Sequence, residues 1–318
     1  MSACPPVLVI AYRRPATTRL VLDAIADAKP SEIFLSINAP NTENPSELSD
    51  HSAVCEMAHE LERGVGATVR IRSDHVSARE SIASSIDWFF SHVQSGIVLE
   101  DDCLPDPTFF YYAGELLDRY EGEKTVAQIS GASHLDEIET DASYYFTKYP
   151  QIWGWATWRD RWAAYRETGE TLDRHRLRCV LDQTFSTAAE REYWRHTFDY
   201  VSSGRLDSWD SLWAFSIWAN SWHCISPDRN LVSNLGFGEG ATNTSRVDER
   251  FANRETLPMP FPLKHPPVEV AFCEEIDRRI AEDFYRIFDS HRAWHWKLRL
   301  AKRLPVRWKK VIKKHLAR

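Results

Sequence analysis

Three consecutive acids, Glu100-Asp101-Asp102, follow the apolar segment Ile97–Leu99 and precede the backbone-breaking residues Pro105 and Pro107. Adjacent carboxylates repel one another, so a folded chain keeps them at a strand end only with a compensating charge. A divalent cation is the natural compensation, because Mg²⁺ and Mn²⁺ take oxygen ligands and keep positions open for substrate phosphates. Acids at the carboxyl edge of an open α/β sheet also lie where such sheets bind ligands. The residues therefore favour a metal–diphosphate site, and an acidic solvated loop is the alternative.

Two arginines, Arg13 and Arg14, stand between a strand-like run and a helix-like segment. Guanidinium groups beside a helix N-terminus can bind an anion, and ordinary surface charge is the alternative. This turn has neither the G-x-G-x-x-G nor the G-x-x-x-x-G-K-[ST] pattern. The missing glycines weigh against a dinucleotide-binding dehydrogenase and a P-loop nucleotidase.

Strand and helix patterns alternate in the first third of the chain and must position these side chains. We expect strands over Val7–Ala11, Ile33–Ile37, 67–72, 96–100 and Thr125–Ile129, and helices over Thr17–Ala28, 51–63, 77–93 and Thr108–Tyr120. Strands separated by crossover helices indicate parallel pairing with right-handed connections. The sequence therefore predicts an α/β fold with a doubly wound, mostly parallel sheet.

The charge of the chain is divided unevenly between a body and a tail. Residues 291–318 contain eleven Lys or Arg and no acid, which leaves 28 basic against 46 acidic side chains, a net charge of −18, in residues 1–290. A basic tail that also carries Trp294, Trp296 and Trp308 is typical of an amphipathic helix on an anionic membrane surface. Nucleic-acid binding and a solvated charged helix are the alternatives, and the acidic body disfavours a nucleic-acid partner.

Composition also indicates a cellular location. No run of 18 apolar residues predicts a membrane span, and no signal peptide is expected at the N-terminus. Six scattered cysteines without a C-x-x-C pair are typical of reduced thiols. We expect a cytoplasmic protein that is attached peripherally to the inner face of the membrane.

Several segments together resemble a known family. They are Val9–Arg14, Leu35–Asn38, Val98–Asp102 with Phe109–Tyr112, and Ser208–Asp210, in that order. They resemble the GT-A-fold, nucleotide-sugar-dependent glycosyltransferases, in particular the branch that contains N-acetylglucosaminyltransferase I. The segment Ile152–Trp158 resembles bacterial sugar transferases of the family-2-like group. The resemblance covers about residues 5–245 and implies a GT-A fold, a nucleotide-sugar donor and a divalent metal, Mn²⁺ or Mg²⁺.

The resemblance implies a donor-binding site near the N-terminus. The family's arginine after the first strand falls on Arg14, with Arg13, Tyr12 and Ala11 beside it. The family's uracil-reading aspartate falls on Asn38, which keeps an acceptor for the base N–H but loses the charge. A UDP-sugar is therefore the expected donor, with the identity of the nucleotide left open.

Further donor and metal contacts follow from the same resemblance. A basic residue in the helix before the acids corresponds to Arg79. Asp102 would hold the metal, Asp101 would contact the donor sugar, and Glu100 would contact the ribose or a metal-bound water.

A general base is needed if transfer inverts the configuration of the sugar, because the acceptor hydroxyl must lose a proton as it attacks. Asp207 and Asp210 lie in an aromatic segment that could exclude water. The family's base falls in a Trp-Asp dipeptide, which selects Asp210 and leaves Asp207 as the runner-up. Asp207 also fits the N-cap of a helix that begins near residue 209, a further reason to prefer Asp210.

Aromatic residues and a glycine-rich loop complete the predicted site. An exposed ring among Trp153 and Trp155 could stack on an acceptor sugar, with core packing as the alternative, and Trp209 is a further candidate. The glycines of 236–240 permit a loop that closes over the donor. Asn243 stands where many relatives place a histidine that contacts metal or phosphate.

The domain boundaries follow from these assignments. Residues 1–257 are expected to form one GT-A domain, with a donor half over about 1–130 and an acceptor half, built onto the sheet, over about 131–257. Residues 258–290 would be a connector and a packing helix, Val268–Ser290, and 291–318 the membrane-surface tail.

The predicted function is metal-dependent, inverting transfer of a hexosyl or N-acetylhexosaminyl group. The donor would be a nucleotide diphosphate sugar, and the acceptor a carbohydrate or lipid-linked saccharide in bacterial surface-polysaccharide synthesis. The alternatives are a sugar nucleotidyltransferase, a glycoside hydrolase and a non-catalytic sugar- or membrane-binding module.

Overall fold

The computed structural model describes residues 4–289, with the exception of 42–44, 137, 139, 170–171, 238–248, 268–269 and 271. The predicted tail over 291–318 and the predicted contact Asn243 lie outside the described residues. Within the described part of the chain, no helix combines the length and the apolar character needed to cross a bilayer.

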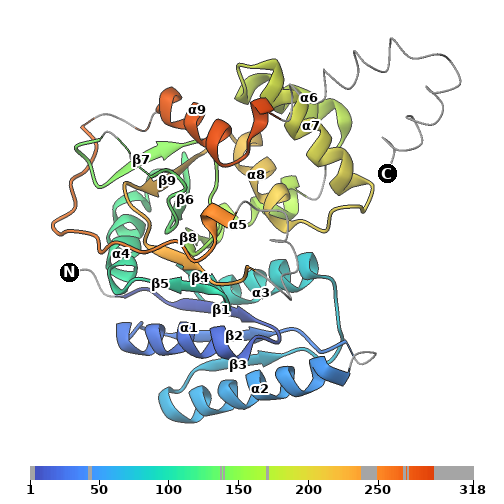
Figure 1. The fold of residues 1–318 in the computed structure, drawn as a ribbon, viewed down its shortest axis with the longest axis vertical. Coiled ribbons are helices and arrows are strands. Elements are labelled where there is room, and N and C mark those ends of the chain that lie inside the picture. The colour runs from blue at the N-terminus through green and yellow to red at the C-terminus, as the bar shows by residue number, and fades with distance from the viewer. Residues whose placement is uncertain are drawn as a thin grey trace, which may run out of the picture.

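An eight-stranded sheet in the order β3-β2-β1-β4-β8-β6-β9-β7 runs through the molecule (Figure 1). The strands are β1 Val7–Ala11, β2 Ile33–Ile37, β3 Thr68–Ile71, β4 Ser95–Glu100, β6 Val126–Ser130, β7 Tyr144–Thr147, β8 Trp155–Trp158 and β9 His223–Pro227. Strands β3, β2, β1 and β4 are parallel neighbours, and β6 is parallel to β9. Strand β8 runs antiparallel to β4 and β6, and β7 runs antiparallel to β9. The predicted α/β fold with a mostly parallel sheet is confirmed.

Strand β1 shows why the sheet is covered on both faces. All five of its residues are buried. Val7, Val9 and Ala11 belong to one hydrophobic core, and Leu8 and Ile10 belong to the other. Continuous apolar runs of this kind form central parallel strands, because alternate side chains enter the two cores on opposite faces.

Helices cover both faces of the sheet. They are α1 Pro15–Ala28, α2 Pro45–Val65, α3 Ala78–His92, α4 Pro107–Tyr120, α5 Arg159–Trp162, α6 Arg174–Thr184, α7 Ala188–Ser202, α8 Trp209–Ala219 and α9 Glu274–Asp283. Helices α1, α2 and α4 contribute to one core, and α3 and α6–α9 contribute to the other. Figure 1 shows α1 and α2 beside β1–β3, and α6–α9 at the opposite end of the molecule.

Local sequence signals fix several helix starts. Ser77 caps α3 by accepting a hydrogen bond from the Glu80 N–H at 3.3 Å. Asp106 caps α4 by accepting one from the Thr108 N–H at 2.8 Å, with Pro107 in the first turn. Both caps satisfy N–H groups that have no partner inside the helix.

Three helix predictions need correction. Helix α2 begins at Pro45, ahead of the predicted start at residue 51, and proline suits the first turn of a helix. The predicted single helix over Val268–Ser290 is wrong, because α9 ends at Asp283 and Arg286 has a φ of 50°. Helices α6 and α7 were not predicted, since their segments are rich in polar residues.

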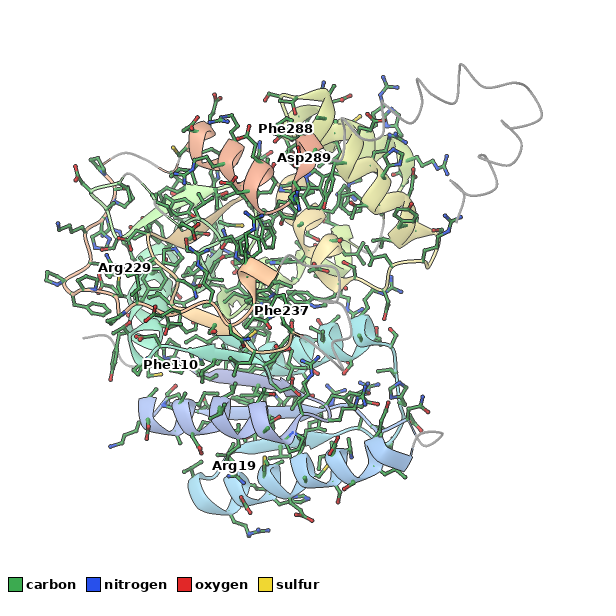
Figure 2. The ribbon with its side chains drawn as sticks, in the orientation of Figure 1. Arg19, Phe110, Arg229, Phe237, Phe288 and Asp289 are labelled. Atoms are coloured by element: carbon green, nitrogen blue, oxygen red, sulfur yellow. The ribbon has the colours of Figure 1, made fainter. Side chains whose placement is uncertain are left out.

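A second, two-stranded sheet brings a distant segment to the acids. Strand β5, Cys103–Pro105, pairs antiparallel with β10, Val232–Asn234. Just beyond β10, the Leu235 N–H donates to the Asp102 carbonyl oxygen at 2.7 Å. This ladder places Gly236 and Phe237 beside the acidic motif, and Phe237 lies near the centre of the molecule (Figure 2).

Candidate functional site

A cleft of about 1560 Å³ opens at the carboxyl ends of the parallel strands. Its walls include the segments that follow β1, β2, β4 and β6, namely Ala11–Thr17, Asn38, Asp101–Asp102 and His134. Its other walls come from distant parts of the chain, among them Trp153, Tyr193, Asp207–Ser211, Asn234–Phe237 and Phe284–Arg286. Open α/β sheets bind ligands at this edge, so the cleft is the candidate active site.

Arg14 is the positive charge nearest to the acidic motif among the described residues. Its guanidinium pairs with the Asp102 carboxylate and lies 3.7 Å from Oδ1 of Asp101. The Tyr12 backbone N–H donates to Oδ2 of Asp101 at 3.0 Å. The structure therefore brings together the arginine and the acids that the sequence placed after two different strands.

The acids remain short of compensating charge despite Arg14. Burial raises the pKa of Glu100 well above its usual value, and the charges of Asp102, Asp101 and Asp210 add to the increase. Burial and the Asp102 charge raise the pKa of Asp101 in the same way, while Arg14 opposes the shift. The motif can therefore accept further positive charge.

Helix N-termini also converge on the cleft. The first turn of α1, Pro15–Thr17, lines it, as do Ala78 at the start of α3 and Trp209–Ser211 at the start of α8. The partial positive charge and exposed N–H groups of a helix N-terminus favour anions. Together with Arg13 and Arg14, these termini make the edge suitable for a diphosphate.

Asn38 and Arg79 differ in how they relate to the cleft. The Asn38 amide donates to the Val76 carbonyl at 2.9 Å, and its Oδ1 accepts from the Ala39 N–H at 3.1 Å, so the amide also holds the neighbouring loop. Arg79 is outside the residues that line the cleft, and its Nε lies 3.6 Å from Oδ1 of Asp207. The base-reading role of Asn38 and the donor contact of Arg79 stay predictions.

The two candidate bases occupy different local environments. Ser208 caps α8 by accepting from the Ser211 N–H at 3.1 Å, and its hydroxyl donates to the Asp210 carboxylate. Asp207 instead accepts from the Arg79 N–H at 3.2 Å and from the Ser77 hydroxyl at 3.3 Å. The prediction that Asp207 caps the helix near residue 209 is therefore wrong, because Ser208 is that cap and Asp207 accepts an N–H in the first turn of α3.

The tryptophans divide between the cleft and the core. Trp153 lines the cleft and packs edge-on against His134, with ring centres 4.7 Å apart. Trp209 reaches the wall of the cleft, but it is only 5% exposed, belongs to the core and stacks on Trp155 at 5.8 Å. Trp155 is only 1% exposed and lies in the core, which corrects the prediction that its ring could stack on an acceptor.

Several residues of the cleft were not found by sequence reasoning. They are His134, Tyr193, Phe284 and Tyr285. Burial raises the pKa values of Tyr193 and Tyr285, and the charge of Asp210 adds to both increases, which places both rings near the candidate base. No local motif marks these positions, because α7 and the turn after α9 reach the cleft only through tertiary packing.

Gly236→Ala is expected to weaken nucleotide binding in the cleft about tenfold, the cost of overpacking a fitted site. A Cβ at Gly236 would lie 1.9 Å from Oδ2 of Asp102 and 2.9 Å from an Arg14 guanidinium nitrogen. The new methyl group would force this ion pair apart. Calorimetric titration with a nucleoside diphosphate measures the effect, with Gly122→Ala as control because nothing lies within 4 Å there. Equal affinity in the two variants would contradict the prediction.

His134→Phe is expected to flatten the pH dependence of stability below about pH 6.5. Burial, followed by the charge of Arg254, lowers the pKa of His134 to about 3 from 6.5. Between these values the unfolded chain binds a proton that the folded chain does not, so His134 makes stability fall as the pH falls, by up to about 1.4 kcal/mol per pH unit. Phenylalanine keeps the ring that stacks on Phe284 at 3.8 Å. Urea unfolding from pH 4 to pH 7 measures how the free energy of unfolding depends on pH. The control His59→Phe changes an exposed histidine and should keep the pH dependence of the unsubstituted protein.

No protein-family model and no curated protein sequence matches the chain. Among solved structures, residues 1–349 of S. aureus TarS are 7% identical, with a TM-score of 0.40 over 70% of this chain and 58% of that chain. Mannose-1-phosphate geranyltransferase from Thermus thermophilus is 10% identical, with a TM-score of 0.38 over 70% and 73%. A 4-diphosphocytidyl-2C-methyl-D-erythritolsynthase from Anaerococcus prevotii is 11% identical, with a TM-score of 0.30 over 54% and 79%. With TM-scores this low, the similarities carry no argument about function.

Proposed function

We propose that the chain is a metal-dependent, inverting glycosyltransferase of the GT-A class. It would move a hexosyl or N-acetylhexosaminyl group from a nucleotide diphosphate sugar to a saccharide acceptor. The observation that carries this proposal is the meeting of Arg14, Asp102 and Asp210, from three distant parts of the chain, in one cleft at the carboxyl edge of the sheet. Such a cleft has groups that can bind an anionic leaving group, Arg14 directly and Asp102 through a divalent cation, and a separate carboxylate, Asp210, that can accept a proton.

The donor would lie along the ends of β1, β2 and β4. Arg13, Arg14 and the N-terminus of α1 are the groups with the right charge for the diphosphate. The nucleoside would lie over the part of the cleft formed by Tyr12, Asn38 and His75, where the Tyr12 and His75 ring centres are 5.8 Å apart. A UDP-sugar stays the expected donor.

The acidic motif is suited to a divalent cation that is bound by the protein and by the donor's diphosphate together. Asp102 lines the cleft and would hold the cation, which neutralises the charge that develops on the departing diphosphate. Among the described residues, no group of three or more His, Cys, Asp or Glu is arranged as a full ligand set. Mg²⁺ commonly binds through one or two carboxylates together with substrate phosphates, so an incomplete protein set is compatible with this role.

Asp210 would act as the general base. Its carboxylate takes the proton of the acceptor hydroxyl while the acceptor oxygen forms a bond to the anomeric carbon. The bond from that carbon to the diphosphate oxygen breaks on the opposite face, so the configuration inverts. The Ser208 hydroxyl orients the carboxylate, and the half-buried ring of Trp153 is the one that would meet the acceptor sugar.

Two parts of the proposal rest on residues outside the described ones. Attachment to the inner face of the membrane depends on the basic tail over 291–318, and a loop contact to phosphate depends on Asn243. Both stay predictions, as does a role in bacterial surface-polysaccharide synthesis with a lipid-linked acceptor.

A thermal-shift screen tests the donor class. The full chain is heated with UDP, GDP, dTDP or CMP, each with and without Mn²⁺. Because a ligand of the folded state raises the melting temperature, one nucleotide should give a shift that grows with Mn²⁺. The matching nucleotide sugar is then offered with saccharide acceptors. No shift with any nucleotide would overturn the proposal, and turnover of a nucleoside triphosphate with a sugar phosphate would favour a nucleotidyltransferase.

A further inference from the structure

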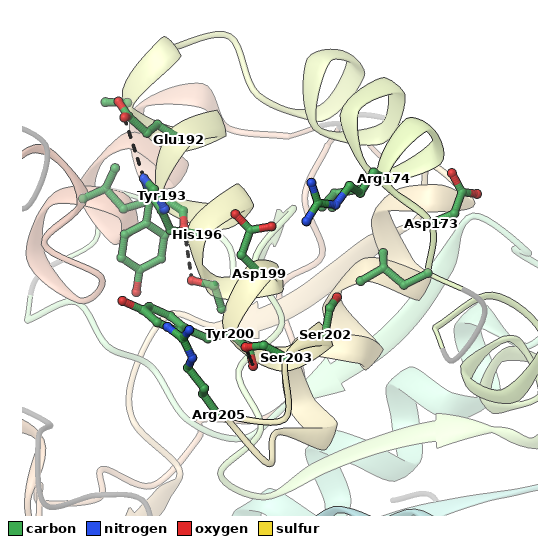
Figure 3. A pocket seen from close by; sticks show the side chains of 15 residues that line it. Asp173, Arg174, Glu192, Tyr193, His196, Asp199, Tyr200, Ser202, Ser203 and Arg205 are labelled. Carbon is green, nitrogen blue, oxygen red and sulfur yellow. Dashed lines mark hydrogen bonds and ion pairs between the residues drawn. The ribbon is translucent and has the colours of Figure 1, made fainter. Parts of the chain in front are cut away.

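A second cavity, of about 870 Å³, lies between α6 and α7 (Figure 3). Polar and aromatic side chains line it together with a few apolar ones. Those that bear on its chemistry are Arg174 of α6, Tyr193, Thr197 and Tyr200 of α7, and Ser203 and Arg205 just after α7. Its volume suits a small organic ligand.

The cavity shares a wall with the candidate active site. Tyr193 and Thr197 line both spaces, and their spacing of four residues puts them on one face of α7. Burial and the charge of Asp210 raise the pKa of Tyr193 to about 12. The tyrosine that borders the cavity is therefore also near the candidate base.

The lining combines ring faces with hydroxyl groups. Tyr200 is 45% exposed, and the Arg205 guanidinium carbon lies 5.7 Å from its ring centre. Figure 3 shows Tyr193, Tyr200 and Arg205 on one side of the cavity and Arg174 on another. Aromatic faces next to polar groups are suited to a sugar, which has an apolar ring face and a polar rim.

The charges of the cavity are unequally paired. Within the described residues, no carboxylate pairs with Arg174 or Arg205. The acids that line the cavity do have partners. Asp173 accepts from the His175 N–H at 2.8 Å, Asp199 lies 3.5 Å from Arg195, and Glu192 lies 3.8 Å from His196. The lining therefore carries both signs of charge, and its two guanidinium groups, which have no paired carboxylate among the described residues, are the groups that can pair with an anionic ligand.

We propose that this cavity binds the part of the acceptor beyond the reacting sugar, and that this part is a saccharide with an anionic group, a carboxylate or a phosphate. The inference rests on the proposed function, because it takes the reacting hydroxyl to lie at Asp210 in the adjoining cleft. A guanidinium can bind either anion through paired hydrogen bonds.

Calorimetric titration of the full chain tests the proposal. The probes are digalacturonic acid for a carboxylate, mannose 6-phosphate for a phosphate, cellobiose as the neutral saccharide, and inorganic phosphate. One of the two anionic sugars should bind at least about tenfold more tightly than cellobiose and inorganic phosphate, as expected for charge-assisted hydrogen bonds. The preferred probe identifies the anion.

Variants assign the binding to this cavity. Arg174→Ala and Arg205→Ala should each weaken binding of the anionic sugar about tenfold. Arg178→Ala is the matched control, because Arg178 lies on the same helix, is 84% exposed and does not line the cavity. Tyr200→Leu should weaken the binding of the preferred anionic sugar and of cellobiose, and it should leave the binding of inorganic phosphate unchanged.

Several outcomes would overturn the inference. They are no saccharide binding, inorganic phosphate binding as tightly as the sugars, or equal losses in Arg174→Ala and Arg178→Ala. Nucleotide titration of the same variants separates this inference from the proposed function. If nucleotide binds and the sugars do not, only the inference fails. If the anionic sugar binds and no nucleotide does, the proposed function fails and with it the assignment of the cavity to an acceptor.

Discussion

Asp210→Asn is expected to lower kcat for sugar transfer by about 10²- to 10⁴-fold, the usual contribution of a positioned general base, and to leave nucleotide binding unchanged. The amide keeps the size of the carboxylate and can still accept the hydrogen bond from the Ser208 hydroxyl. It cannot take the proton of the acceptor. Steady-state kinetics with saturating donor, together with nucleotide titration, separates the chemical step from binding.

Asp207→Asn is the matched control, because it is the same substitution three residues away. Asp207 accepts hydrogen bonds at the start of α3, so its loss should mainly cost stability, about 1 kcal/mol at most, since asparagine is itself a good cap. Full activity in Asp210→Asn would rule out Asp210 as the base. Loss of activity in Asp207→Asn alone would transfer that role to Asp207.

Asp102→Asn is expected to remove the increase in nucleotide affinity that Mn²⁺ or Mg²⁺ provides, a loss of about 100-fold. An amide oxygen is a weaker ligand than a carboxylate, and no other group of acids among the described residues forms a ligand set that could replace it. Arg14 keeps its neighbour Asp101 at 3.7 Å, so the fold of the motif should survive. The measurement is the Kd of a nucleoside diphosphate with and without metal.

Asp106→Asn serves as the control for that experiment. It removes the same charge from the same segment, but Asp106 caps α4 and does not line the cleft. An unchanged metal effect in Asp102→Asn, or an equal loss in both variants, would contradict the assignment of the metal to Asp102.

The sequence was most informative where apolar runs are short and end in breakers. The bounds of Val7–Ala11 and Ile33–Ile37 were predicted as β1 and β2 have them. Parallel pairing places whatever follows each strand at one edge, so Arg14 and Asp102 could be expected at the same edge. Their contact depends on β4 lying beside β1, which the structure shows. Fully buried central strands leave little freedom for another arrangement.

The same reasoning failed where distant partners compete with local ones. Asp207 has the spacing of a cap for α8, yet Ser208 takes that place, and Asp207 instead accepts the Arg79 N–H in the first turn of α3. Trp155 lies in β8, a strand covered on both faces. Its alternate side chains therefore enter one core or the other, and none of them reaches a ligand. Tyr193 lines the cleft from α7, whose amphipathic pattern shows which side is buried but not which distant segment that side packs against.

The tryptophan cluster beside the cleft gives the protein an intrinsic optical reporter. Trp209 lines the cleft and stacks on buried Trp155, which in turn lies 5.8 Å from Trp213. Trp213 and Trp162 are 5.2 Å apart with their planes inclined by 49°. Indole rings held this closely in a fixed, tilted geometry exchange excitation, so a ligand that displaces Trp209, whose ring reaches the wall of the cleft, should alter the near-ultraviolet circular dichroism of the whole group. Ligand binding can then be followed without a label.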